Sequence, residues 1–212
     1  MGRPQILLAD DHTLVLEAFE KLLQATCDVV GTVSDGLALL EAAPRLHPDV
    51  AVIDIAMPRL NGLEAGRRLK QMMPLLKLIY VTMNEDPDVA LRAMQEGGSG
   101  YLLKQAAATE LFQAIKIALK GSTYVGSRIA QRMQQAFMRD PQGKSPDKEL
   151  TARQREVLQL LSEGKSMRQA AEILSVTPRT IAFHKYRMME DLGVATTAEL
   201  IRVGLKSKYV AA

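Results

Sequence analysis

Five polar residues follow short apolar runs in the first half of the chain. Asp10 and Asp11 come directly after the first run, and Asp54 ends the third. Thr82 ends the fourth run and Lys104 ends the fifth. Carboxylates, a hydroxyl and an ammonium are the groups that would hold a divalent cation and a phosphoryl group if they converged.

The carboxylates of Asp10, Asp11 and Asp54 would repel one another in a shared crevice. One pair about 5 Å apart costs ~3 kcal/mol at an effective dielectric constant of about 20. This repulsion could be relieved by a raised pKa of one carboxyl group, by a divalent cation or by the ammonium of Lys104. Oxygen ligands with few carboxylates suit Mg²⁺, and an Asp beside bound Mg²⁺ can attack phosphorus to form an acyl phosphate. Asp54 is the best candidate nucleophile because it ends the central apolar run.

Alternating strand and helix patterns over residues 1–120 would position these groups. β-branched apolar runs predict strands at Gln5–Ala9, Asp28–Thr32, Asp49–Asp54, Lys77–Thr82 and Tyr101–Lys104. Helical periodicity predicts helices at Thr13–Ala25, Gly36–Leu46, Gly62–Met73, Pro87–Gly97 and Ala107–Lys120. This alternation predicts an α/β class fold, a doubly wound five-stranded parallel sheet in the order 2-1-3-4-5. In that order the carboxyl ends of strands one and three flank the switch point, where ligands bind.

The remainder of the chain predicts a different architecture. Residues 121–148 are rich in Gly and Pro and read as a linker with one short helix near Ile129–Met138. Four helices are predicted after it, at Thr151–Glu163, Met167–Leu174, Pro178–Leu192 and Thr196–Leu205. Thr151 with Gln154 fits a capping box, and Thr177 precedes a proline in the first turn of its helix. We therefore expect three regions: an α/β domain over 1–120, a linker over 121–148 and a small all-α domain over 149–212.

Charge separates the two predicted domains. The 212 residues carry a net charge of +3, but residues 1–120 carry −3 and residues 151–212 carry +4. A basic C-terminal segment suggests a nucleic-acid partner. The apolar fraction of 47% and the charged fraction of 24% are ordinary globular values, and Cys27 is the only cysteine. No apolar run approaches the ~18 residues of a membrane span, so a soluble cytoplasmic protein without a membrane partner is expected.

The predicted helix Pro178–Leu192 has two distinct faces. One face, expected to pack in the domain core, carries Ile181, His184, Met188 and Leu192. The opposite face carries Arg179, Phe183, Tyr186, Arg187 and Glu190. A helix that follows another across a short turn and presents Arg and aromatic residues suits a helix-turn-helix reader of the DNA major groove. The other interpretation is a helical interaction module whose exposed aromatic residues contact protein.

The first 120 residues resemble a known family in order and spacing. Asp10-Asp11, the stretch Asp54-Ile55-Ala56-Met57-Pro58 followed by Asn61-Gly62, Thr82, and Gly100-Tyr101-Leu102-Leu103-Lys104 look like the receiver domain of bacterial two-component response regulators. The resemblance implies that Asp54 accepts a phosphoryl group from a sensor histidine kinase. It further implies that Asp11, Asp54 and the Ala56 carbonyl ligate Mg²⁺, with Asp10 supporting the metal waters. The resemblance also implies that Thr82 and Lys104 bind the phosphoryl oxygens. It implies that Tyr101 is the aromatic residue whose rotamer follows the position of Thr82.

The C-terminal segment resembles the LuxR-type helix-turn-helix domain. The resemblance is carried by Leu150-Thr151-Ala152-Arg153-Gln154-Arg155-Glu156-Val157-Leu158, Gly164-Lys165-Ser166, Thr180-Ile181 and Leu192-Gly193-Val194. The whole chain is thus similar to a NarL/FixJ-type regulator, which implies promoter DNA as a partner, regulation of transcription and a homodimer. Ala182 stands where that family usually has Lys, so base contacts are not transferred. The expected DNA-facing residues are Arg179, Phe183, Tyr186 and Arg187, with Lys165 and Lys185 as phosphate contacts.

Three alternative functions would share part of this predicted fold. A phosphatase of the haloacid-dehalogenase type would need an acid/base Asp two residues after Asp54, where Ala56 stands. A flavodoxin-like flavin carrier would need a first loop that accepts phosphate, which Asp10 and Asp11 would repel unless Mg²⁺ intervened. A DNA-binding protein that acts without phosphorylation would keep the fold and omit the chemistry.

Overall fold

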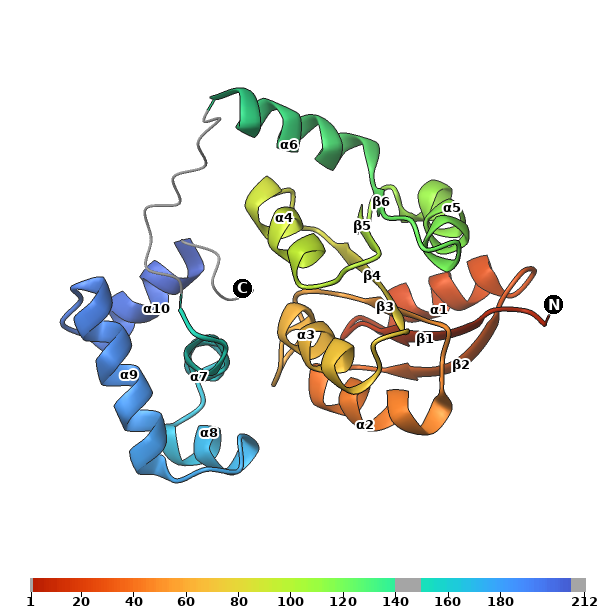
Figure 1. The fold of residues 1–212 in the computed structure, drawn as a ribbon. Helices are drawn as coiled ribbons and strands as arrows, with labels where there is room; N and C mark the ends of the chain where they lie inside the picture. The colour runs from red at the N-terminus through yellow and green to blue at the C-terminus, as the bar shows by residue number, and fades with distance from the viewer. Residues whose placement is uncertain (1, 140–149, 207–212) are drawn as a thin grey trace.

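The computed structural model describes residues 2–139 and 150–206, and its first part contains a parallel six-stranded sheet (Figure 1). The strands are β1 (Gln5–Ala9), β2 (Asp28–Val33), β3 (Val50–Ile53), β4 (Lys77–Thr82), β5 (Gly100–Leu103) and β6 (Tyr124–Val125). Their order is β2-β1-β3-β4-β5-β6, and every neighbouring pair is parallel. All four residues of β3 are buried, as expected for a strand covered on both faces.

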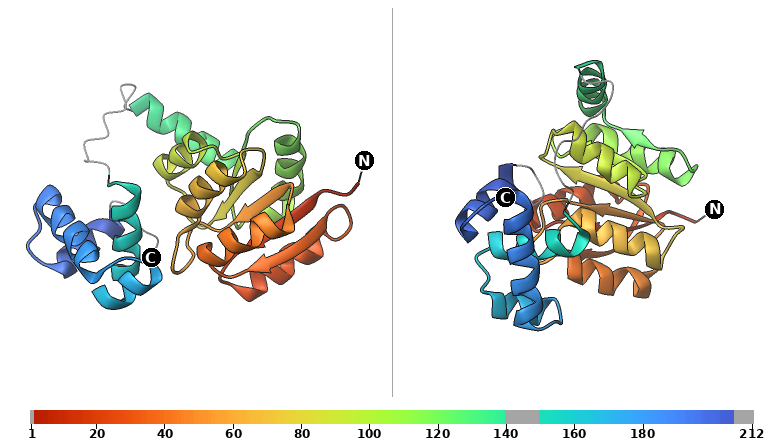
Figure 2. Two further views of the ribbon diagram at one scale, coloured as in Figure 1. Left: turned by 60° about the horizontal axis from the view of Figure 1, so that its bottom comes forward. Right: turned by 60° about the vertical axis from the view of Figure 1, so that its left-hand side comes forward.

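Five helices cover the sheet: α1 (Thr13–Leu23), α2 (Gly36–Leu46), α3 (Gly62–Met72), α4 (Pro87–Gln95) and α5 (Ala107–Leu119). Alternate strand residues point to opposite faces, which creates two cores. One core packs α2, α3 and α4 against residues such as Leu7, Ile53 and Tyr80. The other packs α1 and α5 against residues such as Ile6, Val52 and Val81. Figure 2 shows the resulting three layers.

The expected five-stranded sheet is corrected to six strands, because β6 adds a strand beyond β5. Tyr124 and Val125 pair with Gly100 and Tyr101, and the amide of Gly126 donates to the carbonyl of Tyr101 at 2.9 Å. A two-residue strand is too short to show the period-two alternation that identifies a strand in a sequence. Its pairing with β5 depends on where the chain lies after α5 ends. The local sequence pattern does not encode that position.

The helices that follow are α6 (Ser127–Arg139), α7 (Ala152–Ser162), α8 (Met167–Ile173), α9 (Pro178–Leu192) and α10 (Thr197–Lys206). The capping box of Thr151 and Gln154 is present, and Thr177 caps α9 ahead of its first-turn proline, as predicted. The last four helices enclose a core of their own that includes Val157, Ala171 and Ile181. None of the described helices has the length and apolar character needed to cross a membrane.

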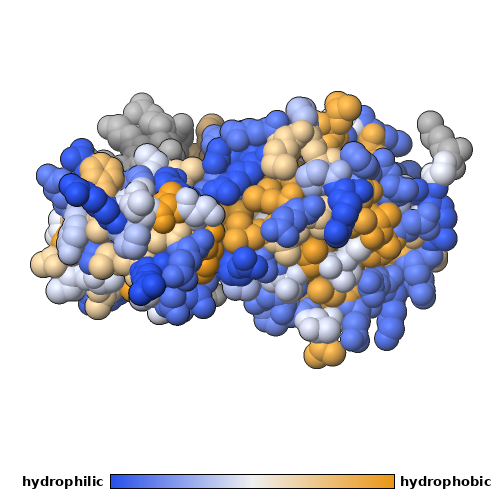
Figure 3. All heavy atoms as spheres, turned by 90° about the horizontal axis from the view of Figure 1, so that it is seen from below, coloured by the Kyte–Doolittle hydropathy of each residue, from blue (hydrophilic) through white to orange (hydrophobic). Residues whose placement is uncertain are grey.

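The α/β part and the helical part contact each other through α3 and α7. Arg68 on α3 pairs with Glu156, and Arg155 on α7 lies 3.6 Å from Glu64 and 3.7 Å from Glu96. Nearby, the backbone amide of Arg59 donates to a carboxylate oxygen of Glu163 at 3.1 Å. Figure 3 shows the two parts adjoining in the space-filling view. The side chains of Glu64 and Glu156 are almost fully buried, so these charges depend on their partners.

Candidate metal centre and nucleic-acid interface

An acidic pocket lies where β1 and β3 end. Carboxylate oxygens of Asp10, Asp11 and Asp54 and a ring nitrogen of His12 all lie within 4.8 Å of one another. The convergence of the three carboxylates, predicted from the strand order, is therefore confirmed. His12 was not predicted to take part, although its position directly after Asp11 and its type as a frequent metal ligand were visible signals. Its Nδ1 atom lies 2.8 Å from an oxygen of Asp11.

Lys104 bridges two of these carboxylates. Its Nζ atom lies 2.7 Å from Oδ2 of Asp10 and 2.7 Å from Oδ2 of Asp54. Burial raises the pKa of Asp54 above its usual range, and the hydrogen bond and charge of Lys104 oppose that rise. Burial tends to lower the pKa of Lys104, but its hydrogen bonds to Asp10 and Asp54 and the charges of these two carboxylates together raise it. The ammonium therefore stays charged and offsets part of the repulsion within the pocket.

The loop after Asp54 is held close to the strand that it leaves. The amide of Ala56 donates to Oδ1 of Asp54 at 3.2 Å, and the amide of Gly62 donates to the carbonyl of Ile55 at 2.9 Å. A Cβ atom at Gly62 would lie 2.0 Å from the carbonyl oxygen of Asp54, so only glycine fits there. Asn61 caps α3 by accepting from the amide of Glu64 at 3.0 Å. These contacts fix the backbone on both sides of the candidate nucleophile.

Hydrogen bonds link Thr82 at the end of β4, Asn84 in the loop after it, and Tyr101 within β5. The amide of Asn84 donates to Oγ1 of Thr82 at 3.2 Å, and the hydroxyl of Tyr101 donates to the carbonyl of Asn84 at 3.0 Å. Thr82 and Tyr101 are both buried, and burial raises the pKa of Tyr101 above its usual range. The amide of Lys104 donates to the carbonyl of Thr82 at 2.9 Å. The hydroxyl of Thr82 and Lys104 are thus placed at adjacent strand ends, and Tyr101 lies within β5.

The expected two faces of α9 are present. Ile181 and Met188 are buried, and His184 and Leu192 are half-buried at the edge of the core. The residues left open to solvent include all four expected DNA-facing positions: Arg179, Phe183, Tyr186 and Arg187. Phe183 is 65% and Tyr186 is 59% exposed, and the described part of the α/β domain does not bury them. The face that would enter a groove is therefore accessible.

The two lysines expected to contact phosphates are less exposed. Nζ of Lys185 lies 4.4 Å from the ring centre of Tyr186 and 3.4 Å from Oγ1 of Thr197. Lys165 is half-buried in the turn before α8, where its amide donates to the carbonyl of Leu160 at 3.0 Å. Arg187 lies 3.2 Å from Glu190 and 3.4 Å from Asp191. A nucleic-acid phosphate would have to compete with these acidic partners for Arg187.

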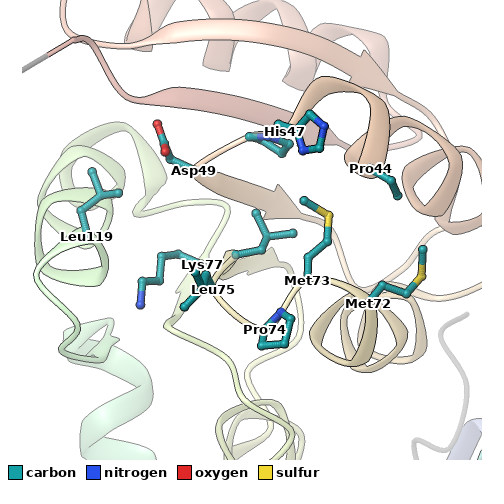
Figure 4. A pocket seen from close by; sticks show the side chains of 11 residues that line it. Pro44, His47, Asp49, Met72, Met73, Pro74, Leu75, Lys77 and Leu119 are labelled. Carbon is teal, nitrogen blue, oxygen red and sulfur yellow. The ribbon is translucent and has the colours of Figure 1, made fainter.

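A separate pocket of about 610 Å³ lies at the opposite edge of the sheet, where β3 and β4 begin (Figure 4). Its wall is mainly apolar, with Met72, Met73 and Leu75 among the side chains that Figure 4 shows. Asp49 and Lys77 are the charged side chains that line it. Asp49 directly precedes β3 and Lys77 begins β4, whereas Asp54 follows the other end of β3 and Thr82 ends β4. This pocket is therefore remote from the acidic site.

Two known families match the chain. Residues 6–116 match the response regulator receiver domain, and residues 148–204 match the bacterial regulatory proteins of the luxR family. The response regulator GacA of Pseudomonas aeruginosa is 30% identical over 208 residues, which cover 97% of this chain and 97% of GacA.

Solved structures of similar sequence carry the same arrangement of elements. RcsB of Salmonella enterica serovar Typhimurium, bound to a promoter in the presence of the phosphomimetic BeF₃⁻, is 28% identical, with a TM-score of 0.68 and coverage of 97% of this chain and 100% of that one. A structure of two RcsB dimers bound to two parallel DNAs is 28% identical, with a TM-score of 0.60 and coverage of 95% and 97%.

Proposed function

This chain belongs to the two-component response regulators that join a receiver domain to a LuxR-type DNA-binding domain, and from this premise we propose that phosphorylation of Asp54 controls its binding to promoter DNA. The family consists of transcription regulators and not of catalytic enzymes. The single observation that carries the choice of Asp54 is the position of its carboxylate directly after the buried central strand β3, where Oδ2 contacts Lys104.

The chemistry assigned to Asp54 is attack on phosphorus by a carboxylate oxygen. A phosphorus–oxygen bond forms to Asp54 as the phosphorus–nitrogen bond of a phosphohistidine donor on a sensor histidine kinase breaks. Lys104 already contacts Oδ2 of Asp54 and is placed to neutralise charge on the phosphoryl oxygens. The hydroxyl of Thr82, on the next strand end, would donate to another phosphoryl oxygen, and Tyr101 would respond to the shift of Thr82.

The acidic pocket fits a magnesium ion. Asp10, Asp11 and Asp54 offer oxygen atoms close enough to share one cation, and the Ala56 carbonyl belongs to the loop held beside Asp54. We assign Asp11, Asp54 and Ala56 as ligands and Asp10 as the partner of metal-bound water. When bound, Mg²⁺ would neutralise the carboxylates and the charge that develops on the phosphoryl group. Within the protein, Lys104 already offsets part of that charge.

The DNA interface proposed here is the exposed face of α9, with Arg179, Phe183, Tyr186 and Arg187 as its contacts and Lys165 and Lys185 as phosphate contacts. Support comes from the exposure of that face and from RcsB, which a solved structure describes as bound to a promoter. A homodimer is proposed because RcsB is described as binding DNA as dimers. We also propose the domain limits 1–120 and 149–212, with 121–148 as a linker whose strand β6 and residue Ile129 pack on the receiver domain.

Labelling with acetyl phosphate tests the choice of nucleophile. With Mg²⁺ present, the wild-type protein should gain one phosphoryl group by intact mass, and Asp54→Asn should gain none. Asp88→Asn, an exposed aspartate on α4, is the matched control and should label as the wild type does. Labelling of Asp54→Asn at the wild-type level would overturn the assignment. Promoter binding by the labelled and unlabelled wild-type protein then measures whether phosphorylation controls DNA affinity.

A further inference from the structure

The helix α6 is tied to the loop that follows Thr82 by a cluster of three charged residues. Arg128 and Arg132 lie one helical turn apart on α6, and both contact Glu85. Nη2 of Arg128 lies 2.8 Å from Oε1 of Glu85, and Arg132 pairs with Oε2. The Glu85 side chain is 21% exposed, while the side chains of Arg128 and Arg132 are 57% and 44% exposed, so these ion pairs lie at the surface and each is of modest strength. We call these three residues the Glu85 cluster.

Glu85 lies inside the segment expected to respond to phosphorylation. The preceding residue, Asn84, contacts Thr82 through its amide and Tyr101 through its carbonyl. The following residue, Asp86, caps α4 and accepts from the amide of Asp88 at 3.1 Å. A displacement of Thr82 therefore has a short backbone path to Glu85.

The N-terminal half of α6 is attached to the strand that carries Tyr101. The amide of Gly126, just before α6, donates to the carbonyl of Tyr101. Ile129 is fully buried in the same core as Tyr101, and α6 packs beside α4 (Figure 1). The C-terminal half is different, because Phe137 and Met138 are 68% and 69% exposed. The Glu85 cluster thus lies on the half of α6 that anchors the helix to the receiver domain.

We infer that the Glu85 cluster reports the state of the Thr82 loop to α6, and through α6 to the DNA-binding helices. Movement of Thr82 toward a phosphoryl group on Asp54 displaces Glu85 from Arg128 and Arg132. Helix α6 then loosens from α4, and the helices that follow it in the chain change position. This inference rests on the proposed function, since it needs a phosphoryl group at Asp54 to move Thr82.

Amide hydrogen exchange of the full-length protein measures the anchoring of α6 directly. Peptides covering residues 127–139 should exchange faster when BeF₃⁻ and Mg²⁺ are added to the wild type. Glu85→Gln removes the charge but keeps the shape, and should raise exchange of the same peptides roughly two- to fivefold without BeF₃⁻. Added BeF₃⁻ should then change these peptides little, because the contact that it breaks is already absent.

Two further variants separate a specific contact from a general loss of charge. Glu41→Gln neutralises an exposed glutamate on α2 and should leave α6 exchange as in the wild type. Reversal of the whole cluster, with Glu85→Arg, Arg128→Glu and Arg132→Glu together, restores opposite charges. It should return α6 protection toward the wild-type level, whereas Glu85→Arg alone should not.

The outcomes are distinguishable. A response to BeF₃⁻ around Asp54 and Thr82 without any change in α6 overturns the inference and leaves the proposed function in place. An α6 response of wild-type size in Glu85→Gln overturns it as well, because the ion pairs would then be ordinary surface contacts. No response to BeF₃⁻ anywhere in the chain removes the proposed function and the inference together.

Discussion

The ammonium of Lys104 lies 2.7 Å from a carboxylate oxygen of Asp54, although the two residues are 50 positions apart in the chain. The same nitrogen also contacts Asp10, so one lysine bridges the ends of β1 and β3. Lys104 therefore places a positive charge against two of the three carboxylates of the pocket.

Removal of Lys104 should make the protein depend more on magnesium for stability. In Lys104→Met the carboxylates of Asp10 and Asp54 lose their shared partner, so their repulsion must be relieved by a cation. We expect added Mg²⁺ to raise the Tm of Lys104→Met by about 2 °C more than it raises that of the wild type. Differential scanning fluorimetry with and without EDTA measures this. Lys116→Met, an exposed lysine on α5, is the control, and equal Mg²⁺ shifts in all three proteins would contradict the bridging role.

The raised pKa of Asp54 predicts a pH-dependent effect of Asp54→Asn on stability. Because the folded protein binds the Asp54 proton more tightly than the unfolded chain, the stabilisation is present below the ordinary pKa of 3.8 and is lost as pH rises through the raised folded pKa. Without divalent cations, Asp54→Asn should therefore unfold at higher urea concentration than the wild type at pH 7. The difference should shrink as the pH falls toward 4. A constant difference across this range would show that Asp54 ionises without cost.

The contact between the two domains should depend on Arg155. This residue lies near two carboxylates of the receiver part, Glu64 and Glu96, and is itself mostly buried. Arg155→Gln should weaken the contact by ~1 kcal/mol or more, because buried carboxylates lose a charged partner. The radius of gyration from X-ray scattering should therefore be larger for Arg155→Gln than for the wild type. Arg168→Gln changes an exposed arginine on α8 and should leave the scattering curve unchanged, so identical curves for both variants would argue against an ionic contact.

The exposed face of α9 predicts two different kinds of loss in DNA binding. Arg179→Ala should weaken promoter binding by ~1–3 kcal/mol. If Arg179 contacts a phosphate, the slope of log affinity against log salt should also fall by about 0.9. Phe183→Ala should weaken binding without changing the slope, because an apolar contact releases no counterions. Fluorescence anisotropy with a labelled promoter fragment at several salt concentrations separates the two effects.

Both side chains are exposed, so neither substitution should lower Tm appreciably. Lys116→Ala, on the receiver domain, should bind DNA as the wild type does. Unchanged affinity in both α9 variants would exclude this face as the interface.

Much of the architecture could be predicted because it is encoded locally. β1, β4, α2 and α9 begin and end where the sequence pattern placed them, since capping residues and apolar periodicity lie within each segment. Other predicted ends differ by one or two residues, where the last turn or strand pairing decides the boundary. The meeting of Asp10, Asp11 and Asp54 followed from strand order alone, because carboxyl ends of parallel strands share one edge of the sheet.

Other features required the folded chain. Four of them join residues through the relative placement of separate elements. They are the bridge made by Lys104, the contact of His12 with Asp11, the added strand β6 and the Glu85 cluster. The contact of Arg155 with Glu64 likewise depends on how two independent cores meet. Sequence by itself determined which residues carry charge, which faces are apolar and which chemistry the acidic residues could support. Only the tertiary structure decided which charges neutralise one another, because that depends on distances between segments remote in the chain.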